Sequence, residues 1–133
     1  MKAVYANGTN YDDPLSVLEV GTMPEPETKP FWSTIRVNSA SVNHHDVWSL
    51  QGVGLSDEQT PMILGTDAAG VLEEDIPVRK GLKAGSEVVL YTFVGTDGAG
   101  VMPGERRSIL SERYAGTMAE YTQVPSANVF AKP

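Results

Sequence analysis

Short segments rich in β-branched and aromatic residues run along the whole sequence, and glycine, proline, asparagine and aspartate separate them at regular intervals. This alternation is typical of mainly-β barrels and sandwiches. We therefore expect a mainly-β fold, with a turn leading into a strand in segment 61–74. Segment 87–94 is apolar on both faces, which predicts a central strand. The other expected strands are residues 2–6, 15–20, 31–42, 117–124 and 128–131.

One segment carries the signals of a short helix. Residues 43–50 begin at Asn43, which can cap a helix N-terminus, and are followed by Gly52, which can end a helix. Asp46 lies in the first turn, where a negative charge interacts favourably with the helix dipole.

Three small residues, Ala68, Ala69 and Gly70, follow one another in segment 61–74. Glycine within a strand often marks a place where another backbone approaches closely. We therefore expect close backbone packing at Gly70.

The composition excludes several kinds of protein. The 133 residues fit one domain, and the absence of cysteine excludes disulfides, thiol nucleophiles and Cys-ligated zinc. The net charge of −7 argues against nucleic-acid binding, which is typical of a basic surface. No uncharged apolar run approaches about 20 residues, and the N-terminal MKAVYANGTN lacks a signal-peptide core. We therefore expect a cytoplasmic protein with no membrane partner.

The charge is distributed unevenly along the chain. Residues 1–75 hold three basic and twelve acidic side chains, whereas residues 76–133 hold seven basic and five acidic ones. The simpler interpretation is a solvated acidic face. The alternative is a basic strip near Arg106, Arg107 and Arg113 that faces a partner domain or an anionic ligand.

Neither the glycine-rich segment nor the two histidines forms a standard binding motif. Segment 95–100 is spaced G-x-x-G-x-G, which is not the dinucleotide-binding fingerprint. His44 and His45 are adjacent, and neighbouring helix positions point about 100° apart, which disfavours a shared metal ion. A zinc site would need carboxylates such as Asp46 and Asp67. A capping or surface role for both rings remains the alternative to an active-site role.

Several segments resemble, in order, one known domain. These are Ala-Ser-Val-Asn-His-His-Asp-Val-Trp-Ser-Leu-Gln-Gly at 40–52, Pro-Met-Ile-Leu-Gly-Thr-Asp-Ala-Ala-Gly-Val at 61–71, Gly-Leu-Lys-Ala-Gly-Ser-Glu-Val-Val at 81–89, and the ending at 116–125 and 128–133. Together they resemble the N-terminal GroES-like catalytic domain of the medium-chain dehydrogenase/reductase superfamily. The resemblance implies a GroES-like, partly open β-barrel with one or two short helices over residues 1–133. The superfamily's Rossmann nucleotide-binding domain is expected to be absent from this chain.

The sequence departs from the zinc-dependent members of that superfamily. Those enzymes carry Cys where this chain has Asn43, and His-Glu where it has Thr66 and Asp67. Their structural zinc lobe would fall between Val94 and Tyr114, where no cysteine is present. The Asn-x-x-Asp pattern is more similar to the zinc-free quinone oxidoreductase branch, so no metal is expected.

The resemblance implies NADPH- or NADH-dependent hydride transfer to an activated carbonyl, enone or quinone. It assigns His45 as proton donor, with Asn43 and Asp46 orienting the substrate and His45. It further implies that His44 contacts the cofactor phosphates. Trp48 and Thr66 are the residues that would line the substrate pocket. For Asp46 the alternative is helix-terminal electrostatics, and for Trp48 it is core packing.

Three interpretations of the whole chain remain open at this stage. The first is that the chain is part of a longer dehydrogenase and is inactive and without cofactor on its own. Its expected partners are then a Rossmann domain of the same parent chain and a small-molecule substrate. A homodimer is compatible with this interpretation. The alternatives are a stand-alone GroES-like binding module and a co-chaperonin ring subunit.

Overall fold

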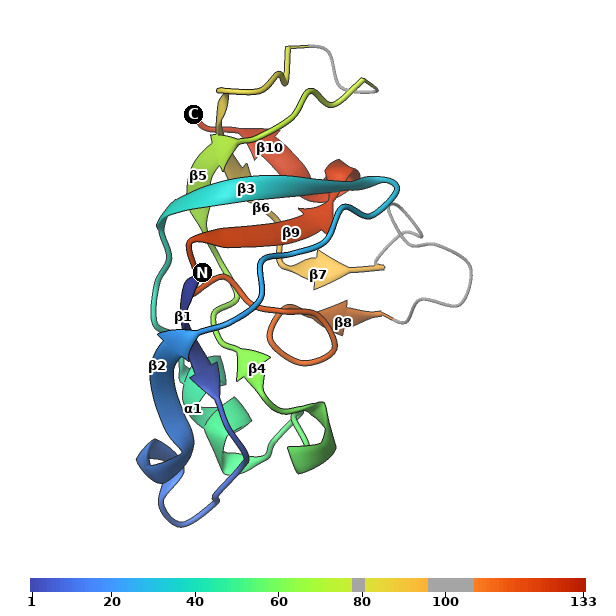
Figure 1. Cartoon of the computed structure of the whole chain (residues 1–133). Helices are drawn as coiled ribbons and strands as arrows, with labels where there is room; N and C mark the ends of the chain where they lie inside the picture. The colour runs from blue at the N-terminus through green and yellow to red at the C-terminus, as the bar shows by residue number, and fades with distance from the viewer. Residues whose placement is uncertain (78–80, 96–106) are drawn as a thin grey trace.

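The computed structural model describes residues 1–77, 81–95 and 107–133 and is mainly β in these ranges (Figure 1). The strands and helix are β1 (Lys2–Ala6), β2 (Leu18–Thr22), β3 (Trp32–Ser39), α1 (His44–Gln51), β4 (Met62–Ile63), β5 (Ala69–Leu72), β6 (Glu87–Leu90), β7 (Phe93–Val94), β8 (Ser108–Ile109), β9 (Tyr121–Pro125) and β10 (Val129–Ala131). Short 3₁₀ turns at Pro14–Val17, Asp57–Gln59 and Ser126–Asn128 connect some of them.

The described strands form three sheets with the orders β2-β1-β4, β10-β6-β5-β3-β9 and β7-β8. The five-stranded sheet occupies the upper half of the molecule in Figure 1, and the small sheet with β1, β2 and β4 lies below it beside α1. Segment 116–119 joins the two, because Gly116 donates to the Ile63 carbonyl and Val4 donates to the Met118 carbonyl. The expected GroES-like, partly open barrel is confirmed.

The apolar core is divided in the same way as the sheets. One cluster lies under the five-stranded sheet and the other lies between α1 and the small sheet. The buried residues of the second cluster, which support the helix, are Ala6, Leu50, Leu55, Met62 and Leu64.

The predicted strand at 87–94 is wrong as a single element. Its first half, β6, is internal as expected, pairing with β10 and β5, but β7 leaves this sheet and pairs with β8. At the break, the side-chain amide of Asn128 donates to the carbonyl oxygens of Tyr91 at 2.9 Å and Phe93 at 2.8 Å. The side chain thus satisfies backbone acceptors where the chain leaves the sheet.

Other strand boundaries also differ from the sequence prediction. The strand expected at 31–42 is present but runs only from Trp32 to Ser39. The strand expected at 15–20 begins only at Leu18, because Pro14 starts a 3₁₀ turn instead. The strand expected at 117–124 begins at Tyr121, because residues 116–119 bridge the two sheets.

The close packing predicted at Gly70 is confirmed. Gly70 pairs with Val37 of β3 and Val88 of β6, so β5 is enclosed on both edges. A Cβ at this position would overlap the backbone carbonyl oxygen of Arg36 and would lie 2.9 Å from Ile35 Cγ2.

In the described part of the chain, no helix is long and apolar enough to cross a membrane. The expectations for residues 96–100 and Arg106 concern positions outside the described residues.

Candidate functional site

The predicted helix is present, and its boundaries match the capping signals. Asn43 has the extended backbone of an N-cap residue, with φ −124° and ψ 162°. Gly52 ends the helix in the left-handed region at φ 86°, a conformation that glycine adopts without strain. The helix N-terminus therefore brings Asn43, His44, His45 and Asp46 to one end of α1.

Asp46 connects the start of α1 to the loop between β4 and β5. Its Oδ2 accepts the backbone N–H of Asn43 at 2.8 Å, and its Oδ1 accepts the backbone N–H of Gly65 at 2.9 Å. The side chain is buried, with the residue only 4% exposed. These are the contacts of a positioning residue, because each carboxylate oxygen accepts a backbone donor.

The loop held in this way forms a polar cluster with the helix start, made of Ser41, Asn43, Thr66 and Asp67. Asp67 accepts hydrogen bonds from the Ser41 backbone N–H and hydroxyl at 2.8 Å, and from Asn43 Nδ2 at 3.0 Å. Asn43 Nδ2 also lies 3.5 Å from Thr66 Oγ1. Asn43 and Thr66, which the sequence analysis singled out, are therefore brought together around Asp67.

The hydrogen bonds to Asp67 favour its ionised form. Burial alone raises the pKa of this carboxyl, but hydrogen bonds from the Ser41 side chain and backbone and from Asn43 outweigh it. They hold the pKa of Asp67 below its ordinary value of 3.8.

A pH-dependent stability contribution follows from this lowered pKa. The folded-state pKa lies below the unfolded one, so the contribution is complete above the unfolded pKa of about 4 and is lost as the pH falls through the folded pKa. We expect the difference in free energy of unfolding between wild type and Asp67→Asn to be larger at pH 6 than at low pH. Urea unfolding of both proteins across pH measures this difference, and a constant difference would contradict the assignment.

His45 contacts three residues outside the polar cluster. Its Nε2 lies 2.9 Å from Glu112 Oε1, and its Nδ1 lies 3.4 Å from Ser111 Oγ and 3.5 Å from Ser49 Oγ. Because a carboxylate can only accept, a neutral His45 carries its proton on Nε2 in this arrangement. The His45 and Glu112 side chains are 18% and 26% exposed, so the pair is only partly shielded from solvent.

Glu112 was missed by the sequence analysis. It lies 67 residues from His45 and reaches it from the turn after β8, where Ser111 is fully buried with a left-handed backbone, φ 69°. No local pattern in the sequence marks this contact. A search for acidic residues that could pair with His45 would have included Glu112 only as one of many.

Comparison with known families assigns the fold to a named domain. The model of the alcohol dehydrogenase GroES-like domain matches residues 29–133. The chain belongs to this family. No curated protein sequence is a significant match.

Solved structures support the family assignment of this GroES-like domain. A crystal structure of an NAD-dependent alcohol dehydrogenase is 35% identical with a TM-score of 0.80, and the match covers 100% of this chain and 40% of that one. The cobalt- and zinc-bound thermostable alcohol dehydrogenase from Pyrobaculum aerophilum is 26% identical with a TM-score of 0.77, covering 99% and 41%. The alcohol dehydrogenase from Aeropyrum pernix, at 22% identity and TM-score 0.77 over 100% and 40%, shares the fold. The GroES-like domain described here therefore spans about 40% of the length of these structures.

The polar cluster of this GroES-like domain does not fit a zinc ion. Zinc is bound by thiolate, imidazole and carboxylate groups, whereas Asn43 offers an amide that donates to Asp67. Thr66 offers a neutral hydroxyl, and the Asp67 carboxylate already accepts from Ser41 and Asn43. Among the described residues no group of three His, Asp or Glu side chains is placed to hold a metal.

The outer side of α1 carries His44 and Trp48. Their rings lie 5.6 Å apart between centroids with an interplanar angle of 44°, and Trp48 is 49% exposed. Core packing of Trp48, one of the two interpretations of the sequence, is therefore wrong. Its assignment to the substrate pocket and that of His44 to the cofactor stay predictions.

Proposed function

We propose that this GroES-like domain is the catalytic domain of an NAD(P)H-dependent oxidoreductase that reduces an activated carbonyl, enone or quinone without zinc. The observation that carries the proposal is the hydrogen-bonded pair of Asn43 and Asp67 at the N-terminus of α1. The resemblance places these residues where zinc-dependent members have Cys and the second residue of a His-Glu pair. The 35% identity to an NAD-dependent alcohol dehydrogenase supports the oxidoreductase class.

Hydride transfer to a carbonyl or enone places negative charge on the substrate oxygen, which must be stabilised and then protonated. A zinc ion polarises this oxygen in metal-dependent enzymes. Without a zinc ion, a hydride acceptor that is already activated needs only hydrogen-bond donors and a proton source. Asn43 is the candidate donor for orienting the substrate, while Asp46 holds Asn43 through its backbone N–H.

We assign the proton source to His45. The Glu112 carboxylate stabilises a proton on Nε2, and the hydroxyls of Ser49 and Ser111 lie within 3.5 Å of Nδ1. This arrangement holds the imidazole in one orientation. As an imidazolium, His45 carries a proton on each ring nitrogen, so it can give one to the substrate oxygen and remain a neutral imidazole with its other proton on Nε2. Glu112 acts through His45 and is therefore a positioning residue.

When bound, the nicotinamide cofactor supplies the hydride. His44, exposed at the first helical position of α1, fits a phosphate group because an imidazole donor and the helix N-terminus both favour an anion. The other half of the cofactor would be held by a Rossmann domain of the same parent chain.

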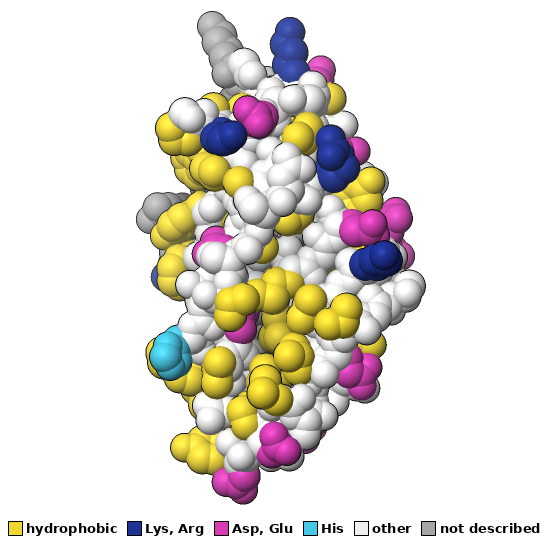
Figure 2. All heavy atoms as spheres, turned by 90° about the vertical axis from the view of Figure 1, so that its left-hand side faces the viewer, with side chains coloured by type: hydrophobic (Ala, Val, Ile, Leu, Met, Phe, Trp, Pro, Cys, Tyr) yellow, Lys and Arg dark blue, Asp and Glu magenta, His cyan; other side chains and the backbone are white. Residues whose placement is uncertain are grey.

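An exposed apolar surface supports such a partner domain. Figure 2 shows hydrophobic side chains gathered on the lower half of the face turned toward the viewer, the half that holds β1, β2 and α1 in Figure 1. The exposed large hydrophobic residues in and next to these elements include Leu15, Val20, Val42, Val47, Trp48 and Val53. A gathering of this kind is typical of an interface between domains.

Substitution of His45 in the full-length protein tests the proposal. We expect His45→Gln to lower kcat about 100-fold, since it removes the proton donor. The matched variant His44→Gln should raise KM for the cofactor and leave kcat nearly unchanged. Glu112→Gln should lower kcat about tenfold and alter its pH profile, because the imidazole loses its carboxylate partner.

Steady-state kinetics with NADPH and NADH and a set of enones, quinones and aldehydes measures these effects. Normal turnover of His45→Gln would remove His45 from the mechanism. Loss of activity on treatment with a zinc chelator would contradict the zinc-independent assignment.

A further inference from the structure

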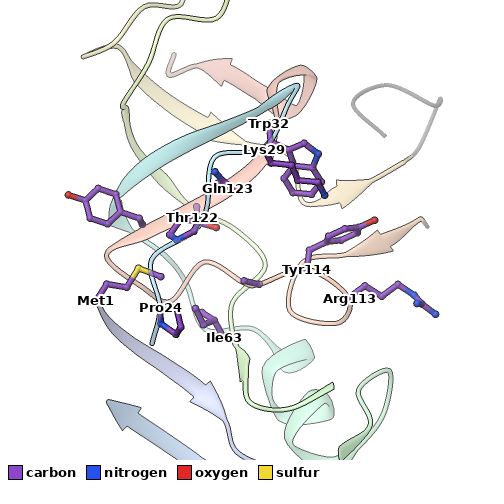
Figure 3. A pocket seen from close by; sticks show the side chains of 12 residues that line it. Met1, Pro24, Lys29, Trp32, Ile63, Arg113, Tyr114, Thr122 and Gln123 are labelled. Carbon is purple, nitrogen blue, oxygen red and sulfur yellow. The ribbon is translucent and has the colours of Figure 1, made fainter. Parts of the chain in front are cut away.

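A cavity of about 280 Å³ lies outside the candidate site (Figure 3). It is bounded by the loop after β2, the first residue of β3, the end of β4, the turn before Gly116, and β9. Its lining includes no residue of the polar cluster and none of the side chains that contact His45. The proposed oxidoreductase function therefore gives this cavity no role.

The charge of the cavity is opposite to that of the protein. The chain has a net charge of −7, yet the charged groups among the described residues that line the cavity are the Lys29 and Arg113 side chains and the N-terminal ammonium group of Met1, and none is acidic. In Figure 3 the Arg113 side chain extends away from the other lining residues. The Met1 ammonium group donates to the Met23 carbonyl oxygen at 2.8 Å, so we take Lys29 as the cation that recognises a ligand. Arg113 adds positive potential at longer range.

Aromatic rings hold the Lys29 ammonium group in place. Lys29 Nζ lies 4.1 Å from the centroid of the Trp32 ring and 5.6 Å from that of Tyr114, both within cation–π range. The two rings pack on each other with centroids 5.2 Å apart. The indole N–H of Trp32 is buried and has no acceptor in the described part of the chain. This wall therefore offers the Lys29 ammonium group as a hydrogen-bond donor next to aromatic surface.

The opposite end of the cavity is mostly apolar. Pro24 and Ile63 contribute hydrocarbon surface there, and Thr122 and Gln123 line it from β9 (Figure 3). Beyond Pro26 and Tyr121, a separate depression is lined by Glu25, Glu73 and Glu74. An anionic group is thus favoured at the Lys29 end, while the hydrocarbon surface of Pro24 and Ile63 accepts an uncharged body.

We propose that this cavity binds a small aromatic carboxylate, with its ring between Pro24 and Ile63 and its carboxylate toward Lys29. The volume suits a single-ring compound, since pockets for drug-sized ligands begin at about 300 Å³. A charge-assisted contact of the ammonium group with the carboxylate selects the anion over a neutral compound of the same shape.

Nuclear magnetic resonance titration of the 133-residue chain with benzoate tests the proposal without any enzyme assay. Saturable shifts are expected at the backbone amides of Ala115, Thr122 and Gln123, with a Kd of about 1 mM or below. Benzyl alcohol, which has the ring but no charge, and acetate, which has the charge but no ring, should each bind about tenfold more weakly.

Variants of Lys29 separate charge recognition from a general apolar effect. Lys29→Met should weaken benzoate about tenfold and leave benzyl alcohol unchanged, whereas Lys29→Arg keeps the charge and the affinity. The control Lys132→Met changes a surface lysine paired with Glu87 and should have no effect. The proposal would be overturned if benzoate gave no saturable shifts at these amides, or if benzyl alcohol bound as tightly as benzoate. It would also be overturned if Lys29→Met left benzoate binding unchanged. None of these outcomes bears on the oxidoreductase assignment.

Discussion

Gly70→Ala is expected to lower the free energy of unfolding by about 4 kcal/mol, a large part of the stability of a domain of this size. The added Cβ would overlap the carbonyl oxygen of Arg36 and press on Ile35 Cγ2. A flexible side chain could move aside, but the main obstacle is backbone. Because β5 is paired with β3 on one edge and β6 on the other, it cannot shift without breaking a ladder.

A second glycine provides the matched control. Gly85 has φ 88°, and a Cβ there would meet nothing within 4 Å, so Gly85→Ala adds only backbone strain. We expect it to cost about 1 kcal/mol. Urea unfolding followed by tryptophan fluorescence measures both variants. A cost for Gly70→Ala no greater than that of Gly85→Ala would show that the two strands are not in close contact at this position.

Asp46→Asn is expected to destabilise the domain by about 3 kcal/mol. Both carboxylate oxygens accept backbone N–H groups, from Asn43 and from Gly65. An amide presents one acceptor and one donor, so one of these N–H groups would face another donor in a buried environment. The helix start and the polar cluster would lose their connection as a result, and activity should fall along with stability.

Asp57→Asn is the control for this substitution. Asp57 also accepts a backbone N–H from a distant residue, Thr9, at 2.7 Å, but only its Oδ1 takes part and the side chain is exposed. An asparagine can present its own oxygen there, so we expect a loss of about 1 kcal/mol or less. Equal unfolding midpoints for the two variants would contradict the role assigned to Asp46.

The parts of the fold that depend on neighbouring residues were predictable from the sequence. The helix at His44–Gln51 lies within one residue of its predicted ends, because the N-cap at Asn43 and the glycine at Gly52 act locally. Strands β1 and β10 and the internal position of β6 were likewise indicated by local apolar patterns. The strand break at Tyr91 was not, because the side chain that binds the backbone there, Asn128, lies 37 residues further along the chain.

The candidate site was also predictable from the sequence only in part. Resemblance to the dehydrogenase family singled out Asn43, Thr66 and His45, and the fold places Asn43 and Thr66 beside each other. It did not indicate that Asp67 is the acceptor joining Ser41 to Asn43, nor that Trp48 is half exposed. Hydrogen-bond partners of this kind depend on side-chain directions that a sequence pattern does not specify.

By itself, the sequence determined a mainly-β fold with one capped helix and without the cysteine of a zinc site, since turn chemistry, capping and residue type are local properties. Its resemblance to a known family implied the GroES-like domain. Only the tertiary structure decided which charges meet. It pairs His45 with Glu112 across 67 residues and places Lys29 Nζ 5.6 Å from the ring centroid of Tyr114, 85 residues away, beside a cavity without acidic lining in its described residues. These contacts arise from the packing of segments far apart in the chain, and no spacing in the sequence encodes them.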